Sequence, residues 1–291
     1  ETATWDNHVM WINPNNANNF IIGGDGGPTI TFDDGNNWSD IDIPTGQFYH
    51  VNLDNDWPYG VYGAQQDNSS IKIKSRTSGY SIGASDWHPV AGGEAGYIVP
   101  DPKDSRITYG GEYDGIFSSY NEANEVYRII SVDPEQHYGA GAITAQRRFN
   151  WTFPIAFSPH NNSCLYATSN FVHRSYDAGV TWETISPDLT RNDPKTLQTS
   201  GGDITLDNTG VEFYGTIFTF AESPVKAGVL WTGSDDGLVH VSTDNGTTWT
   251  NVGSLIRRYG ATTAWSLQTV TLPAGAGNQA TVYVGFLFTS N

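Results

Sequence analysis

The chain has 291 residues, with 14 Lys and Arg against 31 Asp and Glu and a formal net charge of −17. Nucleic-acid binders need basic clusters that displace counterions from phosphates, and the largest basic clusters here are the pairs Arg147-Arg148 and Arg257-Arg258. Composition therefore argues against a nucleic-acid partner. No apolar run approaches the roughly 20 residues of a membrane helix, so we expect no membrane span.

The rest of the composition predicts an extracellular location. The chain is acidic, poor in Lys and rich in Asn, Gly, Thr and Ser, a balance typical of secreted soluble proteins. Its one cysteine, Cys164, lies in an apolar stretch and is expected to be a small buried residue rather than a nucleophile. An internal disulfide is excluded because that needs two cysteines.

An apolar run that ends in proline recurs six times along the chain, at Pro14, Pro58, Pro102, Pro159, Pro224 and Pro273. The mean spacing of about 52 residues is the length of a four-stranded propeller blade with its loops. The first five prolines are each followed by a second apolar run that closes on Asp, Asn or Gly, the residues of hairpin turns. The pattern predicts an all-β fold, a β-propeller of four-stranded antiparallel blades.

The whole chain, 1–291, is interpreted as a single partial propeller. Its approximate blades are 5–43, 47–90, 95–130, 151–186, 212–252 and an incomplete 264–291. About five and a half blades fit this length, and we expect them to be part of a longer chain. The last blade would expose an open edge at Val282, Val284 and Phe286, which invites association. The expected partner at that edge is the remainder of the same chain or another protein that covers it.

Three octapeptides share Ser or Thr, Asp, Gly and Trp at their first, third, fifth and eighth positions. They comprise Thr31, Asp33, Gly35 and Trp38, then Ser175, Asp177, Gly179 and Trp182, then Ser242, Asp244, Gly246 and Trp249. The oxygens can satisfy backbone N–H groups of a tight turn, Gly supplies a positive φ and Trp returns to the core. We interpret the three Asp as turn residues rather than catalytic acids. Trp11, Trp57 and Trp231, in or beside apolar strands, are also expected to pack.

These octapeptides are Asp-boxes, and over most of residues 5–250 the chain resembles the BNR/Asp-box repeat β-propellers. Within that group it is similar to the secreted bacterial sortilin-like and glycosyl-hydrolase-like repeat proteins. The similarity is densest from His8 to Trp38, at Arg148 to Trp151 and at Ser186 to Thr190. The resemblance implies a propeller fold, but the Asp-box is not specific for one activity.

In a propeller, the turns between second and third strands share one face with the crossovers between blades, and the Asp-boxes lie on the other face. The candidate ligand-binding residues on the first face are Gln66, Asp67, Glu112, Tyr113, Asp114, Arg147, Arg148, Trp151, Tyr214, Asp235 and Asp236. Glu94, His137 and Arg191 are placed there too, with Tyr138 and Tyr259 as further loop aromatics that could stack on a sugar. For any single hairpin Asp, a turn role remains an alternative.

Three functions fit these residues. The first is an extracellular binding propeller that recognises a glycan or a peptide on this face. The second is a glycoside hydrolase, which needs two carboxylates. Asp25, in Gly23-Gly24-Asp25-Gly26-Gly27, is the catalytic candidate because it resembles the Asp-x-Gly-Gly of xyloglucanase propellers. The third is an architectural role in a larger assembly. Whether the chain is an enzyme stays open.

Metal ligands are sparse in the sequence. The seven histidines form no pair with ligand spacing, so no metal site and no cofactor is predicted. Calcium binding stays open at two oxygen-rich segments, Asp54-Asn55-Asp56 and Asp203 with Asp207 and Asn208.

Overall fold

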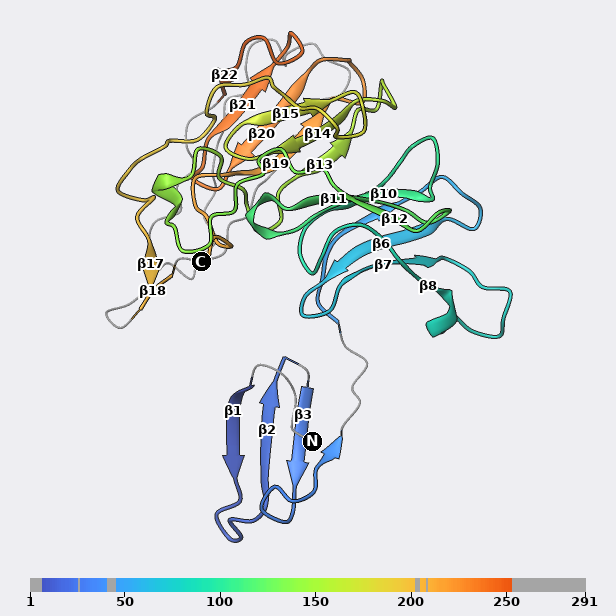
Figure 1. Cartoon of the computed structure of the whole chain (residues 1–291), viewed down its shortest axis with the longest axis vertical. Coiled ribbons are helices and arrows are strands. Elements are labelled where there is room, and N and C mark those ends of the chain that lie inside the picture. Colours follow the sequence, from blue (N-terminus) through green and yellow to red (C-terminus); the bar gives the residue numbers. More distant parts are fainter. Residues whose placement is uncertain (1–6, 26, 41–45, 202–204, 208, 253–291) are drawn as a thin grey trace, which may run out of the picture.

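The computed structural model describes residues 7–25, 27–40, 46–201, 205–207 and 209–252. These residues form five four-stranded antiparallel sheets, and within each sheet the strands follow one another in chain order (Figure 1). The predicted all-β class, a β-propeller of four-stranded antiparallel blades, is confirmed. The described helices are single 3₁₀ turns, η1 (Ala84–Asp86), η2 (Tyr113–Gly115) and η3 (Ala142–Thr144). None of the described helices is long or apolar enough to cross a membrane.

The five sheets are numbered here as blades 1 to 5. Blade 1 contains β1 (Asn7–Ile12), β2 (Phe20–Gly24), β3 (Gly27–Thr31) and β4 (Ser39–Asp40). Blade 2 contains β5 (Phe48–Leu53), β6 (Gly60–Gln65), β7 (Ser70–Lys74) and β8 (Trp87–Pro89). Blade 3 contains β9 (Ile98–Pro100), β10 (Ile107–Gly111), β11 (Phe117–Asn121) and β12 (Val126–Ile129). Blade 4 contains β13 (Ile155–Phe157), β14 (Leu165–Thr168), β15 (Val172–Ser175) and β16 (Glu183–Thr184). Blade 5 contains β19 (Ile217–Glu222), β20 (Leu230–Ser234), β21 (Val239–Ser242) and β22 (Thr250–Asn251).

Two short strands, β17 (Ser200–Gly201) and β18 (Leu206–Asp207), pair in the crossover between blades 4 and 5. The blade predicted over 264–291 lies outside the described residues. So do Asp203, Asn208, the pair Arg257-Arg258, Tyr259 and the predicted open edge at Val282 to Phe286.

The core lies between neighbouring blades. Blades 2 and 3 share Tyr62, Ala64, Val90 and Ile98. Blades 3 and 4 share the largest cluster, Val99, Tyr109, Phe117, Ile130, Phe149, Phe153, Ile155, Leu165 and Ala167. Blades 4 and 5 share Cys164, Tyr166, Val172, Ile185, Leu189, Ile217 and Leu230. The strands of a blade that packs between two other blades are covered on both faces. They therefore lack the alternation of apolar and polar residues that is seen when one face of a sheet is exposed to solvent. All four residues of β14 are accordingly buried.

Blade 1 differs from the others because it stands apart from them (Figure 1). All six residues of its first strand, β1, are exposed, Met10 and Trp11 among them. The first strands of blades 3 and 4, in contrast, are buried or half-buried. The apolar sequence of β1 therefore has no covering neighbour among the described residues.

The three octapeptides form the same hydrogen-bonded turn. In the second one, the Ser175 hydroxyl donates to the Asp177 carboxylate over 2.8 Å and accepts from the Gly179 amide over 2.9 Å, while the Thr181 amide donates to Asp177 over 2.9 Å. The corresponding contacts join Thr31, Asp33, Gly35 and Asn37 in the first, and Ser242, Asp244, Gly246 and Thr248 in the third. The side chain four residues after each Asp also donates to its carboxylate. This contact, and then the backbone hydrogen bonds, lower the pKa of Asp177 to about 2 and also lower the pKa values of Asp33 and Asp244.

The tryptophan of an octapeptide connects two blades. The indole N–H of Trp182 in blade 4 donates to the carbonyl of Ile130, directly after β12 of blade 3, over 2.8 Å. In the same way, Trp249 of blade 5 donates to the carbonyl of Ile185, directly after β16 of blade 4, over 3.0 Å. We call this contact the indole joint.

The packing role predicted for three other tryptophans is wrong, because Trp11, Trp57 and Trp231 are exposed. Trp11 belongs to the uncovered strand β1. Trp57 follows the first strand of blade 2 and lies 5.5 Å from the Arg76 guanidinium, a cation–π contact at the surface. The sequence of an apolar run does not show which of its aromatic side chains faces solvent.

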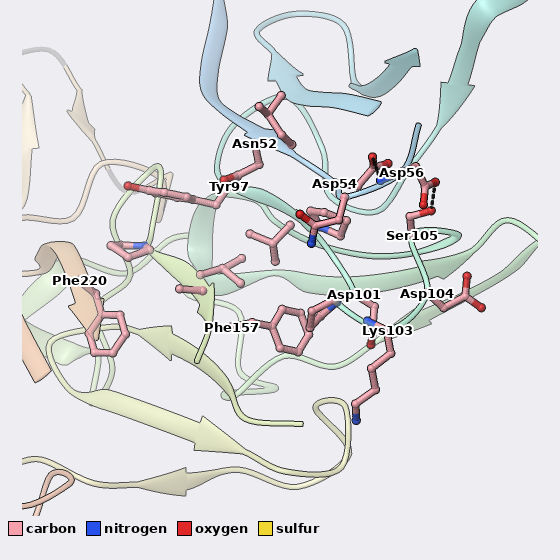
Figure 2. Close-up of a pocket in the computed structure, with 18 residues that line it drawn as sticks. Asn52, Asp54, Asp56, Tyr97, Asp101, Lys103, Asp104, Ser105, Phe157 and Phe220 are labelled. Carbon is pink, nitrogen blue, oxygen red and sulfur yellow. Dashed lines mark hydrogen bonds between the residues drawn. The ribbon is translucent and has the colours of Figure 1, made fainter. Parts of the chain in front are cut away.

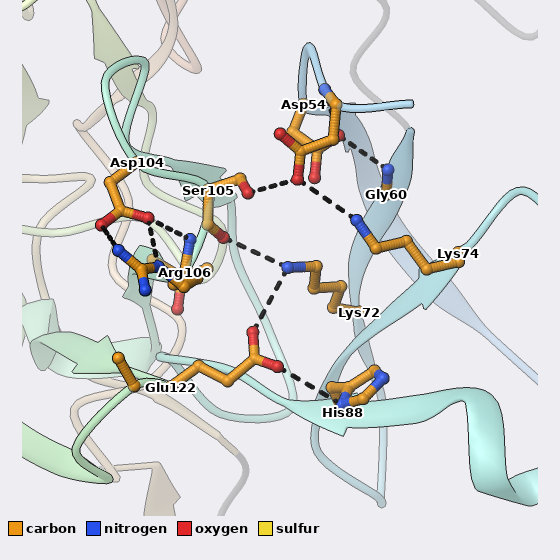
Figure 3. A network of polar contacts seen from close by, with 12 residues as sticks. Asp54, Gly60, Lys72, Lys74, His88, Asp104, Ser105, Arg106 and Glu122 are labelled. Atoms are coloured by element: carbon orange, nitrogen blue, oxygen red, sulfur yellow. Dashed lines mark hydrogen bonds and ion pairs between the residues drawn. The ribbon is translucent and has the colours of Figure 1, made fainter. Parts of the chain in front are cut away.

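A buried lysine joins blades 2 and 3 (Figure 3). Lys72 of β7 is only 3% exposed, and its ammonium group contacts the Ser105 carbonyl at 3.2 Å and the Glu122 carboxylate at 3.4 Å. His88 lies 3.5 Å from the other oxygen of Glu122. Neighbouring Lys74, which is more exposed, pairs with Asp56 at 3.2 Å. A buried charge needs such partners because an unpaired one would be costly.

We expect Lys72→Met to lower the free energy of unfolding by about 1–2 kcal/mol, since it keeps the buried stem but removes a charged donor. Lys74→Met is the matched control, and loss of its more exposed pair should cost less than about 1 kcal/mol. Urea unfolding of both variants measures the difference. Equal losses would contradict the role given to Lys72.

Candidate functional site

The turns between second and third strands lie at one rim of the blades, together with the crossovers, while the octapeptides lie at the other rim. This follows from the chain-order antiparallel pairing, which brings alternate connections to opposite rims. The first rim carries the β6–β7, β10–β11, β14–β15 and β20–β21 turns. We call it the crossover face.

Several predicted binding residues of this face hold the crossovers in place. Asp114, at a positive φ of 56°, is buried and accepts a hydrogen bond from the His137 amide over 2.8 Å. Its other oxygen lies 2.9 Å from Nδ1 of the His137 ring. This buried pair fixes the crossover between blades 3 and 4 onto the turn of blade 3.

Arg148 is likewise engaged within the chain. It is 4% exposed, its Nε donates to the Gly215 carbonyl over 3.0 Å, and its terminal nitrogen donates to Asp188 and Thr190 at 3.0 Å each. Arg147, less buried, pairs with Asp133 at 3.3 Å. The predicted arginine pair therefore ties crossovers together.

The two hairpin aspartates of blade 5 are also engaged. Asp235 accepts from the Gly215 and Thr216 amides, at 3.0 and 2.9 Å, and from the Thr216 hydroxyl at 2.7 Å. Asp236 accepts from the Arg191 amide over 2.6 Å. The turn between β20 and β21 thus binds the crossover between blades 4 and 5.

Five other residues of the crossover face form an aromatic–carboxylate cluster, Glu94, Glu112, Tyr113, Tyr138 and Trp151. The rings of Tyr113 and Trp151 lie 5.4 Å apart with a tilt of 30°. Tyr138 is 52% exposed. The Trp151 indole nitrogen is buried and has no hydrogen-bond partner within the described ranges. Glu94 and Tyr138 come from crossovers, so no short motif joins the five residues.

The carboxylates of the cluster interact electrostatically. Burial, and then the negative charge of Glu94, raise the pKa of the Glu112 carboxyl. A Cβ placed on Gly93 would lie 2.2 Å from the Glu112 carboxyl, so this carboxyl lies directly over Gly93 and a larger residue there would displace it. Glu94 also accepts from the Asp67 amide over 2.8 Å, which links the cluster to the turn of blade 2.

The pKa values of the neighbouring Tyr113 and Tyr138 hydroxyls are raised by burial and by nearby carboxylates. Burial and then Glu112 raise the pKa of Tyr113, and burial, Asp114 and Glu112 raise the pKa of Tyr138. Both hydroxyls thus remain protonated donors at neutral pH. The cluster offers carboxylate acceptors, phenol donors and aromatic rings within one part of the face.

The remaining predicted residues lie elsewhere on the crossover face. Gln66 accepts a hydrogen bond from the Tyr49 hydroxyl. Tyr214 is exposed in the crossover before blade 5. Asp25 follows β2 of blade 1, where it contacts His8.

The surroundings of Asp25 differ from those of a glycosidase pair. Its hydrogen bond with His8 is the main cause that holds its pKa below the usual value, and a hydrogen bond with Asp67 acts in the same direction. In retaining enzymes the two carboxyl groups are about 5–5.5 Å apart, and in inverting enzymes they are farther apart. The partner that the structure shows for the Asp25 carboxylate is instead the His8 imidazole.

A cavity of about 390 Å³ opens near the ends of the first strands of blades 2, 3 and 4 (Figure 2). The sequence did not predict it, although its walls include the proline-ended runs. Tyr97, Val99 and Phe157 line its apolar part. Its size suits a small molecule, which would also need polar groups that the chain leaves free.

The acidic residues of this cavity are engaged in the chain itself. Asp54 accepts from the Gly60 amide at 2.8 Å and the Tyr62 hydroxyl at 2.6 Å, and Asp56 accepts from Ser105 at 2.5 Å. Asp104 pairs with Arg106 at 2.8 Å. Within the described part of the chain, no group of three His, Cys, Asp or Glu residues is arranged to hold a metal ion. Calcium at Asp54-Asn55-Asp56 stays a prediction, because calcium also accepts backbone and amide oxygens as ligands.

Comparisons with known proteins give no match to a family model and no match to a curated protein. Among solved structures, the chain is similar to an auxiliary nutrient binding protein from Bacteroides thetaiotaomicron, with 10% identity and a TM-score of 0.43 over 84% of this chain and 56% of that one. It is also similar to YCF48 bound to D1 peptide, with 14% identity and a TM-score of 0.39 over 81% of this chain and 64% of that one. The chain thus spans less than two thirds of the length of either protein.

The buried carboxyl of Asp235 predicts a pH dependence of stability. Burial is the main cause that raises its pKa to about 6, so the folded chain retains a proton that the unfolded chain releases near pH 4. The free energy of unfolding should therefore fall as pH rises from about 4 to about 6. Asp235→Asn, which keeps the shape of the side chain, should remove the part of this slope that Asp235 contributes. Thermal unfolding across that pH range measures it, and an unchanged slope in the variant would refute the assignment.

Proposed function

We propose that this chain is an extracellular binding propeller that recognises a glycan through the aromatic–carboxylate cluster of Glu94, Glu112, Tyr113, Tyr138 and Trp151. The observation that carries the proposal is the neighbouring Tyr113 and Trp151 rings, 5.4 Å apart, beside the half-buried Glu112. Glu112 is half-buried and Tyr138 is 52% exposed, whereas Asp114 and Arg148 are buried in the crossovers.

The chemistry of the cluster suits a sugar. An aromatic ring offers an apolar face to the C–H groups of a pyranose, and a carboxylate accepts hydrogen bonds from its hydroxyls. A peptide offers fewer hydroxyl donors to the carboxylates, so we favour a glycan and treat a peptide ligand as an outcome of the test.

The contacts of Asp25, the candidate catalytic carboxylate, favour binding over catalysis. The hydrolase proposal requires Asp25 and a second acid at a working distance, whereas the partner of Asp25 in this structure is His8. A hydrolase with Asp25 as one carboxylate stays a separate prediction, and turnover of a polysaccharide that Asp25→Asn abolishes would support it.

We expect a glycan array to identify a ligand, and calorimetry with that ligand to show about 10-fold weaker binding for Glu112→Gln and for Tyr113→Ala. Loss of a hydrogen bond to a charged group corresponds to about that factor. Tyr80→Ala is the matched control, because Tyr80 is fully exposed and lies in the loop before η1.

Three outcomes would contradict the proposal. The array shows no glycan, the two cluster variants bind as tightly as the wild type, or the control weakens binding equally. A peptide ligand with the same dependence on Glu112 and Tyr113 would keep the site and change the ligand class.

A further inference from the structure

The aromatic–carboxylate cluster holds two carboxylates of like charge near each other. The Glu112 carboxyl lies directly over Gly93, the residue before Glu94, since a Cβ on Gly93 would be 2.2 Å from it. Burial, and then the negative charge of Glu94, raise the pKa of Glu112. Like charges held together in a half-buried place destabilise each other. A positive charge at this place would offset their repulsion.

The described part of the chain does not supply that positive charge. The groups that shift the pKa values of Glu112, Tyr113 and Tyr138 include no Lys, Arg or His among the described residues. Three basic residues of the crossover face are paired with other carboxylates, His137 with Asp114, Arg147 with Asp133 and Arg148 with Asp188. A cation that neutralises Glu94 and Glu112 therefore has to come from a ligand.

Aromatic rings lie beside these carboxylates. Tyr113 directly follows Glu112, and its ring lies 5.4 Å from that of Trp151 with a tilt of 30°. The exposed Tyr138 is near enough for its phenol to contribute to the raised pKa of Tyr113. The face of an aromatic ring is electrostatically negative and attracts an organic cation. The rings and the carboxylates thus favour the same kind of ligand group.

An ammonium group fits this arrangement better than a metal ion does. Calcium takes about six to eight oxygen ligands, and no three His, Cys, Asp or Glu residues are grouped for a metal anywhere in the described ranges. An ammonium group has three donors, which two carboxylates can accept while a ring face lies against its carbon neighbours.

We propose that the cluster recognises an amino sugar, whose protonated amine binds Glu112 and Glu94 while its ring lies against Tyr113 or Trp151. This inference rests on the proposed function and names the class of sugar that the site takes. The amine donates charge-assisted hydrogen bonds to the carboxylates and offsets their repulsion. A neutral sugar leaves that repulsion in place, and a uronic acid adds another negative charge.

The test compares two ligands that differ in this charge, a linear tetramer of glucosamine and the same tetramer with every amine acetylated. In calorimetry of the full chain at about pH 6, where an amine is protonated, we expect the glucosamine tetramer to bind at least about 10-fold more tightly. Added salt should weaken its binding and leave that of the acetylated tetramer nearly unchanged. This comparison needs no variant.

Two variants locate the preference in the cluster. Glu112→Gln removes one negative charge with little change in shape and should reduce the preference to about 2-fold or less, because the amine loses a charged acceptor. Glu125→Gln is the matched control, since Glu125 is an exposed residue of the turn between β11 and β12, at the octapeptide rim. It removes the same charge from a chain of net charge −17 and should keep the preference.

Equal binding of the two tetramers would overturn the inference, as would an equal loss of preference in Glu112→Gln and Glu125→Gln. If neither tetramer binds while the array finds another glycan that depends on Glu112 and Tyr113, the inference fails and the proposed function stands. If no glycan binds at all, both fail.

Discussion

The structure depends on one constraint, that each four-stranded sheet has two apolar faces and needs a neighbour on both. Tyr109, Phe117 and Phe153 are among the apolar residues buried between blades 3 and 4. That burial is not directional. The indole joint adds direction, because Trp182 reaches the Ile130 carbonyl only when the two blades are in one relative position. Blade 1 shows what is left when the neighbour is missing, an exposed apolar first strand.

The two rims of the fold differ in how many of their residues are needed to hold the blades and turns together. The octapeptide rim is occupied by turns whose oxygens are engaged in backbone hydrogen bonds, so it has little freedom to change. The crossover face is held by a few buried contacts, chiefly Asp114 with His137 and Arg148 with Gly215. With these in place, Glu112, Tyr113 and Trp151 can be displayed without supporting the fold. A binding site is therefore expected on the crossover face.

The sequence predicted the features that depend on local contacts. The octapeptide turn joins residues two and four positions apart, for example Ser175 with Asp177 and Gly179, so its residue pattern suffices to recognise it. The roles of Arg148 and Asp114 could not be predicted, because their partners lie 67 and 23 residues away. The cluster was foreseen only in part. Glu112, Tyr113 and Trp151 were candidates, but their approach to Glu94 and Tyr138 depends on how two crossovers fold. The cavity was missed for the same reason.

The central claim is that the indole joint fixes blades 4 and 5 on the blades that precede them. The most direct measurement is the free energy of unfolding of Trp182→Phe, which keeps an aromatic ring but removes the N–H that binds the Ile130 carbonyl. Trp231→Phe is the control, since Trp231 is exposed on β20. The account predicts a loss of about 1–2 kcal/mol for Trp182→Phe, the cost of leaving a buried carbonyl without its donor, and almost none for the control. Equal stability of Trp182→Phe and the wild type would contradict the account.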